Sequence, residues 1–465
     1  MKTENKVLKR ISRIAGIKSE QLIPISFFGA ILLGALLLML PFSTAKGEST
    51  SFVTALFTST TSICVTGLVV VDTFSHWSLF GKIIILVLIQ LGGFGIIAVS
   101  SFIMLLFKKN ISYKNRALIH DTYNMDTFKG VVRFLVKVFK GTFIVEMLGA
   151  FLYMPAFIPK FGLAKGIWVS VFNSISAFCN AGIDIMGPDS LISFAEKPYV
   201  LFVTMFLIVM GGMGYVVWFD ILTETRKGIK KKFKPVTVFK HYSEHTRLVI
   251  HLTLALILGG AVITFISEYN NPDTIGNMSL INKIINSLFQ SVTYRTAGFA
   301  SVPQECLRDG SCLLGLLLMF IGGSPVGTAG GVKTVTLFIV LINAVSYIRS
   351  RRETTIKGKR VSEEMIQKAS AIVFVSFTVT FIMMLLLMLI DNIGLMDASF
   401  EVVSATATVG LSRALTSSLS TAGRIIIIIS MYLGRIGPIS MALFFANKPS
   451  GENLVNYADG RFYVG

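Results

Sequence analysis

Four short turns, almost evenly spaced along the chain, place a glycine where backbone carbonyls could bind a cation. The turns read CVTGL, CNAGI, RTAGF and TVGLS, and their glycines are Gly67, Gly182, Gly298 and Gly410. Successive glycines are 115, 116 and 112 residues apart in a chain of 465 residues. This spacing indicates four copies of one structural unit.

The chemistry available to such turns is replacement of a cation's hydration shell by carbonyl oxygens. Glycine permits the unusual backbone angles and leaves room at a central axis. The turns contain no Asp or Glu, so a large monovalent cation fits them better than Ca²⁺ does. One turn supplies too few ligands, whereas four turns in register supply rings of four oxygens. We expect the ion to bind the backbone of Val65, Thr66, Gly67, Asn180, Ala181, Gly182, Thr296, Ala297, Gly298, Thr408, Val409 and Gly410.

Two acidic residues lie just after two of the turns. Asp72 follows Gly67 by five residues, and Asp184 follows Gly182 by two. Either they concentrate cations at the mouth of the site, or they are ordinary charges of solvated loops.

The composition is that of a membrane protein. The chain is 53% hydrophobic and only 15% charged, whereas a soluble domain carries about 25% charged residues. Eight apolar windows are long enough to cross a bilayer, and we expect an all-α, multi-pass protein. The windows are Leu22–Phe42, Leu79–Phe107, Gly141–Ile158, Val200–Leu222, Leu248–Ile266, Leu313–Ile348, Ala369–Ile390 and Ile425–Phe445.

The net charge of +18 is distributed by side of the membrane. Of the 43 Lys and Arg residues, 31 lie in the two terminal segments and in three loops. These are every second loop along the chain, so they share one side of the membrane with the termini. The positive-inside rule therefore places both termini and these loops in the cytoplasm of a plasma-membrane protein. Attraction to anionic lipid explains such loops, and no nucleic-acid partner is expected. The loop at 223–247 is also suited to docking a soluble partner.

A short half-polar segment precedes each turn and is too short to span the membrane. The segments are Thr50–Ile63, Ile167–Phe178, Lys283–Tyr294 and Asp397–Ala407. By topology each begins and ends outside, so we expect four re-entrant pore helices. Their negative C-terminal ends would face the turns, which favours a cation there.

A glycine-containing motif recurs in the span after each turn: LGGFG, MGGMG, IGGSP and LGRIG. Small residues let membrane helices approach closely, which explains the first three motifs. The fourth has Arg435 where the others have glycine. A charge within the membrane marks a functional residue by default, and below a cation filter it would raise the barrier to passage.

These observations predict four tandem span–pore-loop–span repeats around a pseudo-fourfold ion pore. We expect a cytoplasmic tail at 1–21, repeats at 22–107, 108–222, 223–348 and 349–446, and a second tail at 447–465.

The third repeat's second span is interrupted by five glycines, a proline and Lys333 within Met319–Thr336. A continuous helix there would be costly. The alternatives are a kinked helix and an unwound loop that acts as a movable gate under the filter. The segment comprises Gly322, Gly323, Ser324, Pro325, Val326, Gly327, Thr328, Ala329, Gly330, Gly331 and Lys333.

The whole chain resembles the Ktr/Trk/HKT superfamily of potassium transporters, and most closely the membrane subunit of bacterial Ktr systems. The resemblance rests on the four glycine turns, the eight spans and the C-terminal DGRFYVG. Glycine in all four turns matches the potassium-selective pattern. The first triplet residue varies, so the backbone rather than a side-chain ring must bind the ion.

The resemblance implies several further properties. It makes Gly322–Lys333 an intramembrane gate loop and Arg435 an electrostatic barrier. It also implies a homodimer, a cytosolic ring of nucleotide-binding regulatory subunits, K⁺ as the transported ion and Na⁺ as a coupling or activating ion. The sequence contains no Walker-type phosphate-binding motif of its own.

Other classes of function fit less well. A secondary transporter with inverted repeats would need halves of opposite orientation, but the charge pattern gives all four units one orientation. An enzyme would need clustered catalytic groups, and Glu146 is the only carboxylate well inside a span. Cys306 and Cys312 bracket an outside loop and either pair or stay free. The histidines near 241–251 lack ligand spacing for a metal.

Overall fold

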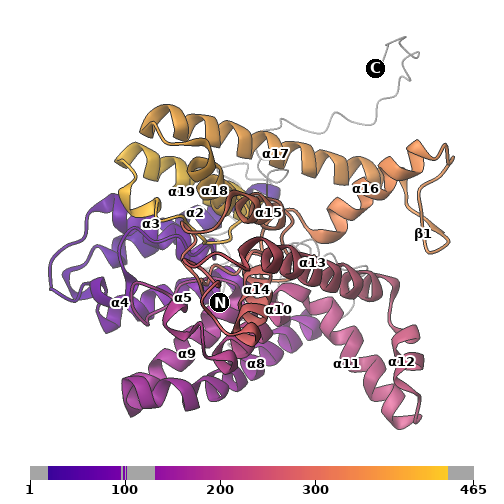
Figure 1. The fold of residues 1–465 in the computed structure, drawn as a ribbon, viewed down its shortest axis with the longest axis horizontal. Coiled ribbons are helices and arrows are strands. Elements are labelled where there is room, and N and C mark those ends of the chain that lie inside the picture. Colours follow the sequence, from indigo (N-terminus) through magenta and orange to yellow (C-terminus); the bar gives the residue numbers. More distant parts are fainter. Residues whose placement is uncertain (1–18, 96–97, 100, 102–130, 438–465) are drawn as a thin grey trace, which may run out of the picture.

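The computed structural model describes residues 19–95, 98–99, 101 and 131–437. Most of the expected tail at 1–21, the loop at 108–130, the inner ends of two spans and the tail at 447–465 lie outside these residues. The described chain is mostly helical (Figure 1), and its single sheet is an antiparallel hairpin of β1 (Thr355–Ile356) and β2 (Lys359–Arg360).

The same order of elements recurs four times: a first helix, a shorter pore helix, a turn and a second helix. The helices before residue 231 are α2 (Ser19–Leu38), η1 (Pro41–Ser43), α3 (Phe52–Ile63), α4 (Thr73–His76), α5 (Leu79–Phe94), α8 (Val131–Phe161), α9 (Leu163–Cys179), η2 (Ile192–Phe194), α10 (Pro198–Met213) and α11 (Tyr215–Lys230). The later helices are α12 (Pro235–His241), α13 (Glu244–Glu268), α14 (Leu280–Thr293), α15 (Asp309–Phe320), α16 (Thr334–Ile348), α17 (Glu363–Asp391), α18 (Leu395–Thr406), η3 (Thr416–Ser418) and α19 (Thr421–Ile436).

Three first helices, α8, α13 and α17, are each long and apolar enough to cross a membrane. The helix α17, at the top of Figure 1, has only 6% of its most apolar window buried within the chain. Its surface therefore faces lipid or another protein rather than the core.

Serine side chains begin many of these helices. In each case the serine hydroxyl accepts a hydrogen bond from the backbone N–H three residues later, which satisfies one free donor of the first turn. The capping serines are Ser51, Ser78, Ser243, Ser279, Ser362 and Ser420. The pore helices α3 and α14 are thus fixed at their outer ends by the sequence just before them.

The second helices are shorter than the sequence predicts. We expected Val200–Leu222 to be one continuous span, but α10 ends at Met213 and the chain bends by 99° into α11. The break is at Gly214, whose φ is 94°. Gly95 and Gly437 end α5 and α19 in the same way, with φ of 82° and 89°. The last glycine of the motif thus ends a helix, because L-residues with side chains rarely adopt such angles.

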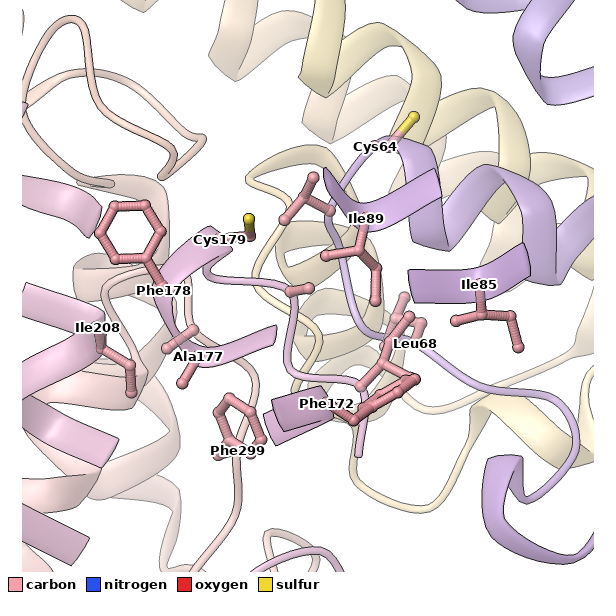
Figure 2. Packing of buried hydrophobic residues seen from close by; sticks show 14 of the residues in the cluster. Cys64, Leu68, Ile85, Ile89, Phe172, Ala177, Phe178, Cys179, Ile208 and Phe299 are labelled. Carbon is pink, nitrogen blue, oxygen red and sulfur yellow. The ribbon is translucent and has the colours of Figure 1, made fainter. Parts of the chain in front are cut away.

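The pore helices and turns lie inside the main hydrophobic core. Figure 2 shows Phe172, Phe178 and Cys179 of α9 in one cluster with Phe299, which follows the third turn. Phe57, Phe172, Phe289 and Phe400, one from each pore helix, are fully buried. The phenylalanine in each pore helix is therefore core packing that holds the helix in place.

Candidate functional site

The four turns have the same backbone conformation. In each triplet the first residue and the glycine both have positive φ. The first residues are Val65 (57°), Asn180 (60°), Thr296 (63°) and Thr408 (53°), and the glycines are Gly67 (104°), Gly182 (64°), Gly298 (84°) and Gly410 (96°). Two left-handed residues in three, one of them not glycine, are uncommon and are retained where surrounding structure enforces them.

Each turn is tied to the end of its own pore helix. The Thr66 N–H donates to the Thr61 carbonyl, the Ala181 N–H to Ser176 and the Val409 N–H to Ser404, each at 2.8 Å. In the third repeat the Ala297 N–H donates to the Thr293 carbonyl at 3.0 Å. Side chains add to this, since Thr61 Oγ1 accepts from the Gly67 N–H at 2.9 Å. The Ser404 hydroxyl accepts from the Gly410 N–H at 3.0 Å.

The glycines meet in a closed ring. A methyl group added at Gly182 would lie 2.7 Å from the Ala297 carbonyl oxygen, and one at Gly298 would lie 2.5 Å from that of Val409. The ring continues from Gly410 to the Thr66 carbonyl and from Gly67 to the Ala181 carbonyl. Each glycine thus faces the carbonyl before the next glycine, in the order of the chain, and the fourth turn closes onto the first.

The arrangement gathers oxygen ligands without any charged side chain in the ring itself. One carbonyl of each turn lies beside the glycine of a neighbouring turn, and rings of carbonyl oxygens are the ligand set expected for a dehydrated monovalent cation. The side chains at the first triplet position differ, as expected, but three of them share a feature. Asn180 Nδ2, Thr296 Oγ1 and Thr408 Oγ1 are buried without a hydrogen-bond partner in the protein. The two hydroxyl oxygens are available to water or to a cation beside the ring, and the Asn180 amide nitrogen is available as a donor to water.

The interrupted span of the third repeat is an unwound loop and not a kinked helix. The helix α15 ends at Phe320, and α16 begins at Thr334. Ile321 and Val332 form a parallel bridge between the two ends, and the Gly322 N–H donates to the Val332 carbonyl at 3.0 Å. The chain between them therefore leaves the helix axis and returns to it.

This loop is held against the break in the second repeat's helix. The Ser324 N–H donates to the Gly212 carbonyl at 2.9 Å, and the Thr328 N–H donates to Gly211 at 3.1 Å. The Tyr215 N–H in turn donates to the Val326 carbonyl at 3.1 Å. The bend at Gly214 thus creates the backbone groups that receive the loop.

The loop also contacts two of the turns. Thr328 Oγ1 donates to the Phe178 carbonyl and contacts Asn180 Oδ1, each at 3.1 Å. A methyl group at Gly330 would lie 2.7 Å from the Ala407 carbonyl, which directly precedes the fourth turn. The loop lies against the ends of the second and fourth pore helices, next to the first residues of their turns.

Arg435 joins this loop to the first repeat. Its Nη1 donates to the Thr328 carbonyl at 2.8 Å, and its Nη2 donates to the Gly92 carbonyl at 2.5 Å. Lys333 Nζ donates to the Ala329 carbonyl at 2.5 Å within the loop. Both cationic side chains therefore hold unwound backbone, in addition to any effect of their charge on a passing ion.

The two acidic residues near the mouth differ in role. Asp72 accepts from the N–H groups of Phe74 and Ser75, each at 3.1 Å, and so caps α4. Asp184 accepts from the Met186 N–H at 3.1 Å. The pKa of Asp184 is raised to about 6, mainly by burial and in smaller part by the nearby Asp72 charge, against hydrogen bonds from Met186 and Ser190 that lower it.

Several groups near the turns were missed by sequence reasoning. Glu401 of α18 is fully buried and accepts from Ser412 at 2.6 Å and Thr416 at 2.5 Å, just after the fourth turn. Arg413 pairs with Asp397 at 2.8 Å. Its Nη1 contacts Cys312 Sγ at 2.9 Å, and Cys306 and Cys312 are both free thiols. A carboxylate in the middle of a pore helix, away from its first turn, was the signal for Glu401.

Residues 25–456 match the TrkH family, described as "Cation transport protein". The chain is 37% identical over 445 residues to "Ktr system potassium uptake protein B" of Bacillus subtilis, covering 96% of each chain. It is 35% identical over 438 residues to "Potassium/sodium uptake protein NtpJ" of Enterococcus hirae, covering 93% of each.

Among solved structures, the potassium transporter TrkH of Vibrio parahaemolyticus superposes with a TM-score of 0.72 at 15% identity. The superposition covers 92% of this chain and 84% of that one. At this identity the likeness shows the fold, which confirms the multi-pass helical architecture predicted from the sequence.

Proposed function

The chain belongs to the TrkH family of cation transport proteins, and we propose from that premise that it is the pore-forming subunit of a Ktr-type potassium uptake system. Relatives over nearly the full length are named as potassium uptake proteins, and one is named for potassium and sodium. K⁺ is the transported ion in this proposal, with Na⁺ as a coupling or activating ion.

The observation that carries the proposal is the closed ring of four glycine turns. The carbonyls before Gly67, Gly182, Gly298 and Gly410 each lie beside the glycine of a neighbouring turn and belong to residues without charged side chains. Such a ring favours a weakly hydrated monovalent cation, since carbonyl dipoles repay the lost water without binding the ion too tightly to leave. We assign the twelve triplet residues as the selectivity filter.

Gly322–Lys333 is the gate in this proposal. The loop lies against the ends of two pore helices, and Arg435 holds it to the first repeat through Thr328 and Gly92. Hydrogen bonds to Gly211 and Gly212 can be exchanged without unfolding a helix, because the receiving carbonyls are already at a helix break. Movement of this loop would open the path on the cytoplasmic side of the filter.

The proposed assembly has partners. A cytosolic nucleotide-binding ring would dock on the basic cytoplasmic face, to which the end of α11 and the turn after it contribute exposed Lys230, Lys231 and Lys232. Both termini are cytoplasmic, the subunit forms a homodimer in the cell membrane, and the four repeats divide as the turn spacing predicts. A secondary active transporter of another cation or solute is the alternative, and four repeats of one orientation argue against it.

Growth of a potassium-uptake-deficient cell at low potassium tests the proposal. Expression of the chain with its cytosolic partner should restore growth, and the Gly298→Ser variant should restore it poorly because the added side chain enters the ring. Absence of rescue by the wild-type chain at normal membrane expression would contradict potassium uptake. Equal rescue by both chains would contradict the filter assignment.

A further inference from the structure

We propose that Glu146 is a positioning residue of the gate, which acts through Gln90 on the end of α5 that receives Arg435. The inference rests on the proposed function and adds to it a residue remote from the filter sequence motifs. Its basis is a buried carboxyl group that breaks the symmetry of the repeats.

Glu146 occupies a position that is apolar in two other repeats. A pore-helix serine donates to the backbone carbonyl of the first helix in each case: Ser59 to Ile31 at 2.7 Å, Ser174 to Glu146 at 2.6 Å and Ser291 to Ile257 at 2.8 Å. The three first-helix residues are therefore structurally equivalent. They are 3%, 4% and 8% exposed, so isoleucine fills this site well and a carboxyl group is not needed for packing.

The partners of Glu146 connect two repeats. Gln90 Nε2 of α5 donates to both carboxyl oxygens, at 3.0 and 2.8 Å. Gln90 Oε1 accepts from the Cys179 thiol at 3.2 Å. Within the described part of the chain, no ion pair to Glu146 is found, and no group of three metal-ligating side chains surrounds it. A buried carboxyl group satisfied mainly by one amide fixes the direction of that amide.

The Gln90 amide lies on the last turns of α5. It is two residues before Gly92, whose carbonyl accepts a hydrogen bond from Arg435 Nη2 at 2.5 Å. A methyl group at Gly93 would lie 2.6 Å from Cys179 Sγ, so this end of α5 also packs on the residue before the second turn. The Gly92 carbonyl also accepts from the Gly95 N–H at 3.2 Å, so the end of α5 is held both by its own cap and by Arg435.

The contacts form a closed circuit. Glu146 binds Gln90 on α5, and α5 also carries Gly92. Arg435 joins Gly92 to Thr328. Thr328 contacts Asn180, and the neighbouring Cys179 donates back to Gln90. Loss of the Gln90 contact would let the end of α5 shift and would weaken the hold of Arg435 on the loop. The expected result is a gate that opens without its regulator.

The test uses the full chain reconstituted in liposomes without cytosolic protein, with K⁺ flux measured at equal density of monodisperse protein. Glu146→Ile, which copies the equivalent residues Ile31 and Ile257, should raise this basal flux at least threefold. Glu146→Gln keeps an oxygen that accepts from Gln90 and should stay close to wild type. Gln90→Leu removes the same bond from the partner side and should match Glu146→Ile.

Two controls separate gating from folding. Glu268→Gln alters a carboxylate that is also buried, but is bonded at the outer end of α13 by Asn271, Thr274 and Ser311; basal flux should not change. Adding Glu146→Ile to Arg435→Ala should raise flux no further than Arg435→Ala alone, since both act on one contact.

Basal flux unchanged in Glu146→Ile and Gln90→Leu would overturn the inference, as would equal effects of Glu146→Ile and Glu146→Gln. The inference would also be overturned if the basal flux of the double variant rose by the product of the increases in Glu146→Ile and Arg435→Ala. If the wild-type chain carries no K⁺ at all with its regulator present, the proposed function fails, which is a separate result.

Discussion

At the scale of single residues, the ring of turns depends on the absence of four side chains. Each glycine faces a backbone carbonyl of the next turn at a distance that no Cβ tolerates, and each has a φ that residues with side chains rarely adopt. A side chain there must displace the carbonyl that would bind the ion.

We predict that serine at Gly182 or Gly298 lowers the preference for K⁺ over Na⁺ by about tenfold, equivalent to about 1.4 kcal/mol. The measurement is the ratio of K⁺ to Na⁺ uptake for each variant. Gly259→Ser on α13 is a matched control, because nothing lies within 4 Å of an added Cβ there. An unchanged ratio in both ring variants would contradict the filter assignment.

In the proposed function, Arg435 acts in two ways that change flux in the same direction. Its charge opposes a cation, and a fixed charge about 6 Å from an ion at an effective dielectric of 20 costs roughly 3 kcal/mol. Its hydrogen bonds to Thr328 and Gly92 hold the loop. We therefore predict that Arg435→Ala raises maximal flux by up to about a hundredfold. Arg435→Lys should raise it less, because the charge remains and one bond is lost.

The comparison is made in reconstituted protein at equal density. Equal flux from wild type, Arg435→Ala and Arg435→Lys would rule out both roles. Loss of flux in an Arg435→Ala protein that still runs as a single species in gel filtration would assign Arg435 to the open state instead.

Asp184 should make potassium uptake depend on external pH. Burial raises its pKa to about 6, with Asp72 adding to the shift. Its carboxyl group is therefore neutral at pH 5 and charged at pH 7, and the charge attracts cations to the mouth. We expect a lower KM for K⁺ at pH 7 than at pH 5, and Asp184→Asn should remove this difference.

The raised pKa of Asp184 also makes the stability of the protein depend on pH. A carboxyl group whose pKa is raised by folding binds a proton more tightly in the folded state, so stability falls as pH rises through about 6. Asp184→Asn should therefore raise the melting temperature at pH 7 and leave it nearly unchanged at pH 4. A KM that follows pH equally in wild type and Asp184→Asn would contradict the assignment.

At the scale of elements, the loop at Gly322–Lys333, the gate in the proposed function, is hydrogen-bonded to the broken helix beside it and should move relative to that helix. The loop bonds to Gly211 and Gly212 at the end of α10, where the motif glycine turns the chain away. Deleting Val326–Gly331 removes the contacts to Tyr215, Asn180 and Arg435 together. We predict higher basal K⁺ flux and weaker dependence on the cytosolic regulator, measured with and without that partner. Loss of flux in a folded, correctly assembled protein would make the loop structural.

The sequence predicted some elements well because their signals are local. Turn glycines, short pore helices and the interrupted span follow from residue types at neighbouring positions, and the multi-pass helical fold predicted with them is confirmed. The breaks at Gly95, Gly214 and Gly437 were missed, since a glycine in an apolar run serves close packing and helix termination equally well. Only the backbone angle distinguishes the two.

At the scale of the whole molecule, equal spacing predicted four equivalent units, but the contacts that make them unequal lie between repeats. The pairing of Gln90 with Glu146 joins residues 56 apart, and that of Thr328 with Phe178 joins residues 150 apart. No local pattern encodes such a pairing. The sequence could therefore mark Glu146 and Arg435 as unusual charges in the membrane without naming their partners.

The order in which the ring closes has a consequence for synthesis. The fourth turn completes the circle with the first, and Arg435 bonds to Gly92 across 343 residues of chain. At a ribosome speed of about 5 to 20 residues per second, roughly 20 to 70 seconds separate the translation of those two residues. Until the fourth turn is made, the first turn lacks one of its neighbours. In the proposed function, a nascent chain in the membrane therefore has no complete filter before its last repeat is synthesised.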